Sequence, residues 1–268
     1  MGWKSGYVQV GEVRLHYWRR GTGAPLVLAH GFGDSGECWT RVAEALEDEY
    51  DIVAYDARYH GLSDAPDTAE MQRSAMGDDL VGVCEALALE RPAIMGHSMG
   101  GMTVMFAAAA YPELFSCAVM EDPPFWSEEP PQRQPSALPG TVEAVEEMGR
   151  KFNPGWHESE FGPWARAKLQ LRMQMQGRRG LPGIDAWRTE VAKMDLPTLL
   201  VCGGNRERMA IVTDEVAAEM RRTNPQLDVV KFAGAGHNVR REAFEGFVAA
   251  TRAFLGKHAG AALTNSAT

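Results

Sequence analysis

The distribution of apolar and polar positions divides the chain into short apolar runs that alternate with longer helix-like segments. Two β-rich runs, 7–10 and 12–18, open the chain and are separated by Gly11, as in a hairpin. Further apolar runs lie at 25–29, 51–55, 91–95, 116–120, 197–202 and 227–232, and helix-like segments at 37–47, 71–88, 101–111, 213–222 and 241–255. This alternation predicts an α/β protein whose sheet is mostly parallel and covered by helices on both faces. Functional groups in such folds gather beyond the carboxyl ends of the strands.

The alternation breaks between residues 123 and 195, where proline and tryptophan are frequent. Helical patterns recur there near 141–152, 164–176 and 183–192. We therefore expect a core domain made of residues 1–122 and 196–268, with residues 123–195 inserted as a helical cap. The inner face of the insertion is expected to form an apolar lid over the active site, with three candidate pocket residues, Trp126, Trp164 and Trp187. The alternative is that these rings form a small core of the insertion itself.

A sharp turn between an apolar run and a helix-like segment carries the strongest catalytic signal. Residues 96–100 read Gly-His-Ser-Met-Gly, and Pro112 ends the helix-like segment that follows. A serine held in such a strained turn leaves no room for side chains on its flanks, which explains the two glycines. The hydroxyl of Ser98 is then presented at a helix N-terminus, where N–H groups favour a developing oxyanion. The pattern predicts a nucleophile elbow with Ser98 as the nucleophile, and a plain glycine-rich turn is the alternative.

A serine nucleophile requires a base, and His237 is the candidate among the seven histidines. It lies in the glycine-rich stretch 234–238, between an apolar run and the last helix-like segment, so the backbone there can aim the imidazole. His97 adjoins Ser98 in the sequence, but neighbouring side chains on an elbow point in different directions. We therefore expect His97 to pack beside the elbow rather than to act as the base.

An oxyanion hole requires two backbone N–H donors. One is expected from Met99, the residue that follows the nucleophile. The second is predicted to be Phe32, because the stretch 30–34 follows an apolar run and has glycine on both sides of Phe32. Glycine neighbours let the backbone approach a ligand closely.

Together these motifs resemble the α/β-hydrolase-fold superfamily, in the form of a serine hydrolase with a cap domain, over essentially the whole chain. The resemblance rests on residues 30–33, on the elbow, on Gly236-His237 and on residues 56–63, Asp-Ala-Arg-Tyr-His-Gly-Leu-Ser, which are similar to the family's D-x-R-G-H-G-x-S. Tyr59 stands where that pattern has glycine. The resemblance implies a mostly parallel eight-stranded sheet flanked by helices, and a catalytic triad whose third member is an acid.

The position of this acid departs from the family's pattern. Family members usually carry an aspartate shortly after the run that corresponds to 197–202, but residues 203–208 read Gly-Gly-Asn-Arg-Glu-Arg. Glu207 is one candidate, because a glutamate also orients and stabilises an imidazolium; its alternative role is an exposed partner of the neighbouring arginines. Haloalkane dehalogenases and zearalenone-type lactonases can carry the acid at the end of the preceding strand, which corresponds to Asp122. We favour Asp122, with Glu207 second and Glu121 third, although relatives with the usual acid also often have a structural aspartate at this position.

The residue types limit the reaction. Dehalogenases and epoxide hydrolases of this family attack with aspartate, so Ser98 sets both activities aside. A serine, a histidine base and an oxyanion hole suit acyl transfer, and we predict hydrolysis of carboxylic esters or lactones through an acyl-enzyme on Ser98. A C–C bond hydrolase or a haloperoxidase-like enzyme uses the same residues and stays open. A small-molecule sensor with slow turnover is an alternative of another class.

Composition limits the partners. The 268 residues carry a net charge of −9, which argues against nucleic acid or an anionic membrane as the partner. We expect an apolar small-molecule substrate, a monomer or homodimer, and no cofactor or metal, because no cluster of histidines or carboxylates has ligand spacing. Four dispersed cysteines without a C-x-x-C motif, and an N-terminal stretch without an apolar run, predict a cytoplasmic protein.

Overall fold

An eight-stranded sheet forms the centre of the computed structural model, which describes residues 2–66, 73–125, 138–172 and 186–259. The strands are β1 (Lys4–Val10), β2 (Val13–Gly21), β3 (Ala24–Ala29), β4 (Tyr50–Tyr55), β5 (Ala93–His97), β6 (Ala118–Glu121), β7 (Thr198–Gly203) and β8 (Leu227–Phe232). Their order is β1-β2-β4-β3-β5-β6-β7-β8. Strand β2 pairs antiparallel with β1 and β4, and the remaining pairs are parallel. The mostly parallel eight-stranded sheet expected from the sequence is confirmed.

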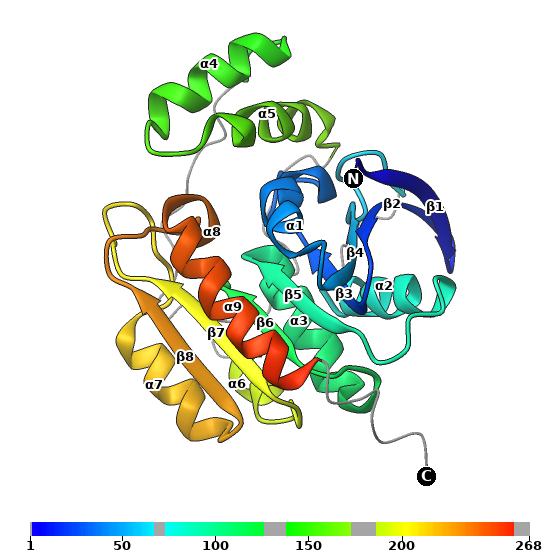
Figure 1. The fold of residues 1–268 in the computed structure, drawn as a ribbon, viewed down its shortest axis with the longest axis vertical. Coiled ribbons are helices and arrows are strands. Elements are labelled where there is room, and N and C mark those ends of the chain that lie inside the picture. The colour runs from blue at the N-terminus through cyan, green and yellow to red at the C-terminus, as the bar shows by residue number, and fades with distance from the viewer. Residues whose placement is uncertain (1, 67–72, 126–137, 173–185, 260–268) are drawn as a thin grey trace.

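Helices cover both faces of the sheet (Figure 1). Alternate residues of a strand point to opposite faces, and on β3 Leu26 and Leu28 belong to one buried cluster whereas Val27 and Ala29 belong to the other. Residues of α1 (Thr40–Leu46) and α9 (Phe244–His258) complete the first cluster; residues of α2 (Arg73–Ala86), α3 (Met99–Ala110), α6 (Ala186–Val191) and α7 (Asp214–Thr223) complete the second. Burial on both faces explains why the central strands read as nearly continuous apolar runs.

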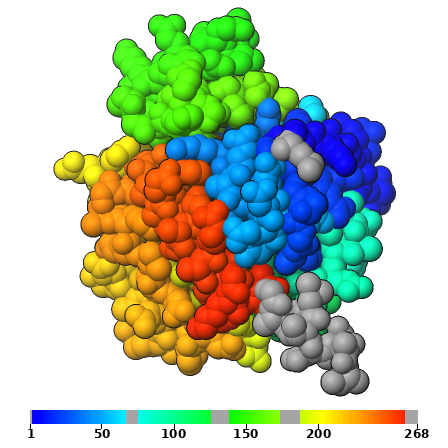
Figure 2. Space-filling view, in the orientation of Figure 1, coloured from blue at the N-terminus to red at the C-terminus, as the bar shows by residue number. Residues whose placement is uncertain are grey.

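Two helices between β6 and β7 lie apart from these layers. They are α4 (Val142–Phe152) and α5 (Phe161–Gln170), joined through η3 (Glu158–Glu160), and Figure 2 shows this α4–α5 segment as a block over one end of the molecule. Arg166 on α5 forms an ion pair with Glu37 at 2.6 Å, and the Nζ atom of Lys168 donates to the carbonyl of Gly33 at 2.8 Å. The segment is therefore held against the loop that follows β3, at the carboxyl end of the sheet. Helix α6 instead packs against α3 and α7, and the division into core and cap domains stays a prediction.

Several local features differ from the patterns expected. The 3₁₀ helix η1 (Gly36–Trp39) precedes α1, another, η2 (Pro112–Leu114), follows α3, and the last helical pattern splits at Ala243 into α8 (Val239–Glu242) and α9. Helix α5 ends at Gln170 because Leu171 is extended, with ψ 119°; residues 173–176 of the expected helix lie outside the described residues.

Tyr59 has φ 68°, which is the region that favours glycine. The tyrosine thus adopts a backbone conformation that suits the glycine of the similar family motif.

The four cysteines are free and buried. Burial is the main cause that raises the pKa of each thiol to about 12, so these side chains stay protonated and behave as small apolar groups in the neutral range. Within the described ranges, none of the helices has the length and apolar character needed to cross a membrane.

Candidate active site

Ser98 occupies a strained turn between β5 and α3. Its backbone has φ 52° and ψ −115°, a conformation that residues with a side chain rarely adopt. A Cβ atom on Gly96 would lie 2.1 Å from the carbonyl oxygen of Gly100, and one on Gly100 would lie 2.0 Å from that of Ala29. Only glycine fits at these two positions. The half-buried Ser98 is thereby held at the N-terminus of α3, in the geometry expected of a nucleophile elbow.

The structure brings His237 and Asp122 together although 115 positions separate them in the sequence. The Nδ1 atom of His237 lies 2.7 Å from Oδ2 of Asp122. When Nδ1–H donates to the carboxylate, Nε2 of the neutral ring is left as an acceptor for a hydroxyl proton. The ring centroids of His237 and His97 lie 4.7 Å apart, and His97 is the residue before Ser98. The imidazole therefore lies beside the elbow.

The Asp122 carboxylate is fully buried at the end of β6. Its backbone φ of 38° marks a sharp turn of the chain after the strand. The two carboxylate oxygens accept hydrogen bonds from the backbone N–H groups of Ile211, at 2.9 Å, and Val212, at 3.2 Å. These donors and His237 replace the water that the carboxylate loses on burial.

The two other acid candidates lie in different surroundings. Glu207 is exposed in the turn after β7. Glu121 is fully buried, but its carboxylate accepts hydrogen bonds from the backbone N–H of Arg240, at 2.8 Å, and from Nη1 of the same residue, at 3.2 Å. Burial raises the pKa of Glu121, and the charge of Arg240 opposes this effect. Of the three candidates, Asp122 is the one whose carboxylate contacts His237.

The stretch after β3 packs directly against the elbow. A Cβ atom on Gly31 would lie 2.6 Å from Nδ1 of His97 and 3.4 Å from Cβ of Ser98, so a glycine there lets the chain pass next to the serine. In the part of the chain that the structure describes, the backbone N–H groups of Phe32 and Met99 donate to no protein acceptor. Two uncommitted N–H groups close to a nucleophile are what an oxyanion hole requires.

His97 links the elbow to the loop of His237. Its Nε2 donates to the backbone carbonyl of His237 at 3.0 Å. Burial first, and then the charge of Arg240, lower the pKa of His97 well below its usual range. The ring is therefore neutral, its one proton lies on Nε2, and its contacts agree with the expectation that it packs beside Ser98.

Comparison with known proteins identifies the family. Residues 24–240 match the family model described as the alpha/beta hydrolase fold. The chain belongs to this family. The N-formylmaleamate deformylase of Pseudomonas putida is 28% identical over 93% of this chain and 96% of its own length. The 2-(acetamidomethylene)succinate hydrolase of Mesorhizobium japonicum is 29% identical over 87% of this chain and 88% of its own.

Solved structures show the same fold. The structure of an N-formylmaleamic acid deformylase from Pseudomonas putida has a TM-score of 0.72 at 25% identity and covers 92% of this chain and 100% of that chain. That of an E-2-(acetamidomethylene)succinate hydrolase has a TM-score of 0.75 at 23% identity and covers 95% and 99%. The family and these full-length similarities show that this α/β-hydrolase-fold protein is a hydrolase.

A buried ion cluster between the α4–α5 segment and the loops of the site was not predicted from the sequence. Asp34 accepts hydrogen bonds from Nη2 of Arg240 and of Arg241, both at 3.0 Å, and from Nζ of Lys168 at 3.1 Å. Arg241 also bonds Glu160, at 3.0 Å, and Arg240 bonds Glu121. The cluster therefore has three acids, Asp34, Glu121 and Glu160, and three bases, Lys168, Arg240 and Arg241. The adjacent arginines shortly after His237 were a visible signal, but their partners come from distant segments.

This cluster connects the α4–α5 segment to the catalytic loops, since Lys168 lies on α5 and Glu160 on η3. Burial raises the pKa of Asp34, but the charges of Arg241, Lys168 and Arg240 outweigh it and hold that pKa well below its usual value. The carboxylate of Asp34 is thus ionised throughout the neutral range.

The three predicted pocket tryptophans have different surroundings. Trp187 is 4% exposed and stacks on Phe125 with ring centroids 5.6 Å apart, within the core cluster that contains α3. Trp164 is half-buried, and the ammonium of Lys168 lies 5.2 Å from its ring centroid. Trp126 lies outside the described residues. A pocket role for Trp164 and Trp187 stays a prediction.

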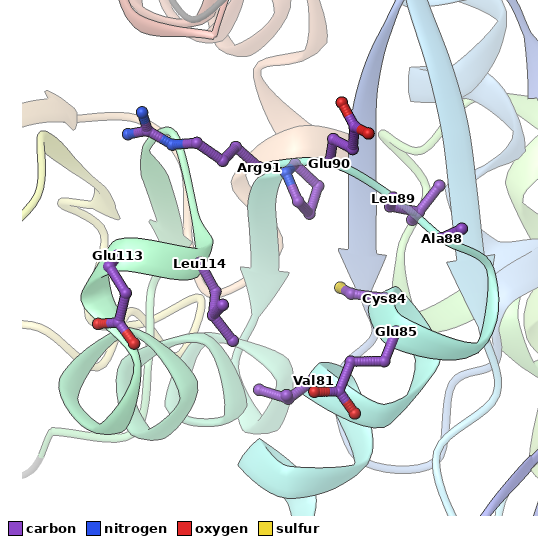
Figure 3. A pocket seen from close by; sticks show the side chains of 10 residues that line it. Val81, Cys84, Glu85, Ala88, Leu89, Glu90, Arg91, Glu113 and Leu114 are labelled. Carbon is purple, nitrogen blue, oxygen red and sulfur yellow. The ribbon is translucent and has the colours of Figure 1, made fainter.

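A cavity of about 500 Å³ lies at the N-terminal end of β5, which is the end away from Ser98 (Figure 3). Arg91 and Pro92, which precede β5, line it together with Cys84 and Leu114. Because a strand rises about 3.3 Å per residue, the length of β5 separates this cavity from Ser98. Ligands of parallel sheets bind beyond the carboxyl ends of the strands, so this cavity is not the catalytic pocket.

Replacing a glycine of the elbow should destabilise the fold. Gly96→Ala is expected to lower the free energy of unfolding by about 3 kcal/mol, because its Cβ would overlap a backbone carbonyl that has no free space to move into. Gly256→Ala is the matched control: in α9 its Cβ meets nothing within 4 Å, and the alanine should raise stability by about 0.5–1 kcal/mol. Urea unfolding of both variants measures the difference, and equal stabilities would contradict the assignment of steric crowding at the elbow.

Removing a charge from the buried ion cluster should destabilise the fold in a way that depends on pH. Asp34→Asn is expected to cost about 3–5 kcal/mol at pH 7, because it leaves the buried cluster with one unbalanced positive charge, although Arg240 and Arg241 keep Glu121 and Glu160 as partners. Since the pKa of Asp34 is depressed in the folded state, this stabilisation exists above the unfolded pKa, about 3.9, and is lost as pH falls below it. The difference between wild type and variant in urea unfolding should therefore shrink from pH 7 to pH 3. Glu49→Gln, which removes an exposed ion pair with Arg252, should cost less than about 1 kcal/mol.

Proposed function

We propose that this protein hydrolyses the acyl carbon–nitrogen bond of a small amide through an acyl-enzyme on Ser98. The observation that carries the proposal is the 2.7 Å contact between Nδ1 of His237 and the buried carboxylate of Asp122, next to a serine at φ 52°. A nucleophile, a base and an acid, with the base between the other two, are the recurring arrangement of serine acyl hydrolases.

The proposed roles follow from the contacts. Asp122 holds the imidazole with its proton on Nδ1 and stabilises the imidazolium that forms when Nε2 accepts the proton of the Ser98 hydroxyl. Ser98 attacks the substrate carbonyl, and the N–H groups of Phe32 and Met99 donate to the developing oxyanion. His237 returns the proton to the leaving nitrogen. Water, activated by the same imidazole, then cleaves the acyl-enzyme.

The choice of bond rests on the relatives. The two curated proteins that match nearly the full chain are named as a deformylase of N-formylmaleamate and as a hydrolase of 2-(acetamidomethylene)succinate. Both names denote substrates in which a formyl or acetyl group is joined to nitrogen. This supports an N-acyl substrate over the ester or lactone expected from the sequence, while the same triad also suits esters.

A substrate panel tests this proposal. Steady-state hydrolysis of N-formyl and N-acetyl amides should proceed with many turnovers per enzyme, and esters and lactones of matched acyl groups form the comparison set. Ser98→Ala should reduce turnover of every active substrate by about 10⁴-fold or more. Ester turnover without amide turnover would overturn the bond assignment, and wild-type activity in Ser98→Ala would overturn the mechanism. A ligand that raises the melting temperature but is not turned over repeatedly would instead favour the sensor.

The acid has a test of its own. Asp122→Asn should lower kcat by about 10³–10⁴-fold, because an amide in place of the carboxylate favours the wrong imidazole tautomer. Glu207→Gln is the matched control and should keep wild-type kcat, since Glu207 is exposed. Circular dichroism checks that both variants fold. A loss in Glu207→Gln together with full activity in Asp122→Asn would reverse the assignment.

A further inference from the structure

The loop after β7 lies where relatives usually carry the catalytic acid, and here it makes a closed turn whose carboxylate, that of Glu207, is exposed. The backbone carbonyl of Asn205 accepts hydrogen bonds from the N–H groups of Arg208 and Ala210, each at 3.2 Å. Beyond the turn, residues 210–212 are buried, with Ile211 at 8% exposure and Val212 at 2%. The loop therefore holds a short buried stretch of chain against the end of β6.

Arg206 binds the carbonyl side of this stretch. Its Nη1 atom donates to the backbone oxygens of Ala210 and Ile211, both at 2.7 Å. An Nη atom of a guanidinium carries two N–H groups, so one nitrogen serves both acceptors.

The same two peptide groups bind Asp122 with their other ends. The carbonyl of Ala210 and the N–H of Ile211 belong to one planar peptide, and the carbonyl of Ile211 and the N–H of Val212 belong to the next. The two N–H groups donate to Oδ2 and Oδ1 of Asp122, at 2.9 and 3.2 Å. Each peptide thus has a guanidinium at its oxygen and a carboxylate at its N–H, which is the orientation that its dipole favours.

We propose that Arg206 is a positioning residue for the catalytic acid, which it holds and polarises through the two peptide groups that bind the Asp122 carboxylate. The inference rests on the proposed mechanism of Ser98, His237 and Asp122. Hydrogen bonds in such a chain strengthen one another, and both ends of this chain are charged. Arg206 therefore fixes both oxygens of Asp122 and, through Oδ2, the imidazole of His237.

The groups around the Asp122 carboxylate do not mask the effect of Arg206 on the pH profile of activity. His237 bonds Oδ2 from the loop after β8, and the Cys202 thiol lies near the carboxylate from β7. The neutral ring of His97 and the carboxylate of Glu121, which is paired with Arg240, also lie near His237. Burial, with the charge of Asp122 as the second cause, raises the pKa of Cys202 to about 12. The thiol is neutral in the working range, so a change in the pH profile on removal of Arg206 is not caused by Cys202.

Kinetics of Arg206→Met test the proposal on any substrate that wild type turns over. We expect kcat to fall by roughly tenfold with little change in KM, because the variant loses charge-assisted hydrogen bonds that act on the acid and not on the substrate. The acidic limb of the kcat/KM profile should move to higher pH. Removing a positive charge and loosening the donors to Asp122 both favour the imidazolium form of His237.

Two further variants complete the design. Arg206→Lys keeps the charge and a donor for the two carbonyls, so it should restore most of kcat and the wild-type acidic limb. Arg221→Met removes an exposed arginine on α7 and should match wild type in both readouts. If Arg206→Met does not fold, Arg206→Gln, which keeps a donor without the charge, should still move the acidic limb to higher pH.

The outcomes separate this inference from the proposed function. The positioning role is overturned if Arg206→Met, or Arg206→Gln in its place, has the kcat and acidic limb of Arg221→Met. It is also overturned if Arg206→Lys is as impaired as Arg206→Met, because retained charge and donor would then have no effect. Wild-type activity in Ser98→Ala, by contrast, would overturn the proposed function itself.

Discussion

The close contact between the chain after β3 and the turn after β5 is the constraint on which the rest of the site depends. The Ala29 carbonyl leaves room at residue 100 for a hydrogen but not for a methyl group, and Gly31 lies against both His97 and Ser98. Two parallel strands that end side by side bring these loops to the same edge of the sheet. Their contact places the N–H group of Phe32 near the serine, and the strain at Ser98 is maintained by the packing of both loops.

The buried ion cluster links these loops to the α4–α5 segment. Three acids and three bases make it neutral as a whole, and each carboxylate has a cationic partner within 3.2 Å. Such a cluster gives little net stability when complete, but it is costly to break, because the loss of one member leaves a buried charge unbalanced. Arg240 and Arg241 are neighbours in the short helix α8, and both are buried although their acid partners lie on different segments.

The proposed acid and the groups that bind its carboxylate come from two neighbouring strand ends. With Asp122 at the end of β6, the loop after β7 supplies the N–H groups that the carboxylate needs, and Arg206 binds the far side of the same peptides. The two loops are neighbours because β6 and β7 pair in parallel. The carboxylate at the end of β6 therefore contacts the imidazole of His237 while the loop after β7 donates to both of its oxygens.

The sequence by itself determined the alternation of strands and helices, the elbow at Ser98 and the candidate base, because each depends on short-range rules of periodicity, glycine sterics and turn formation. It left three candidates for the catalytic acid, Glu121, Asp122 and Glu207, because these residues differ in burial and in the contacts of their carboxylates rather than in the local sequence pattern. The ion cluster and the contacts of the loop after β7 were decided by tertiary structure alone. Each depends on pairing between residues up to 207 positions apart, and local sequence does not encode which distant charge will lie opposite.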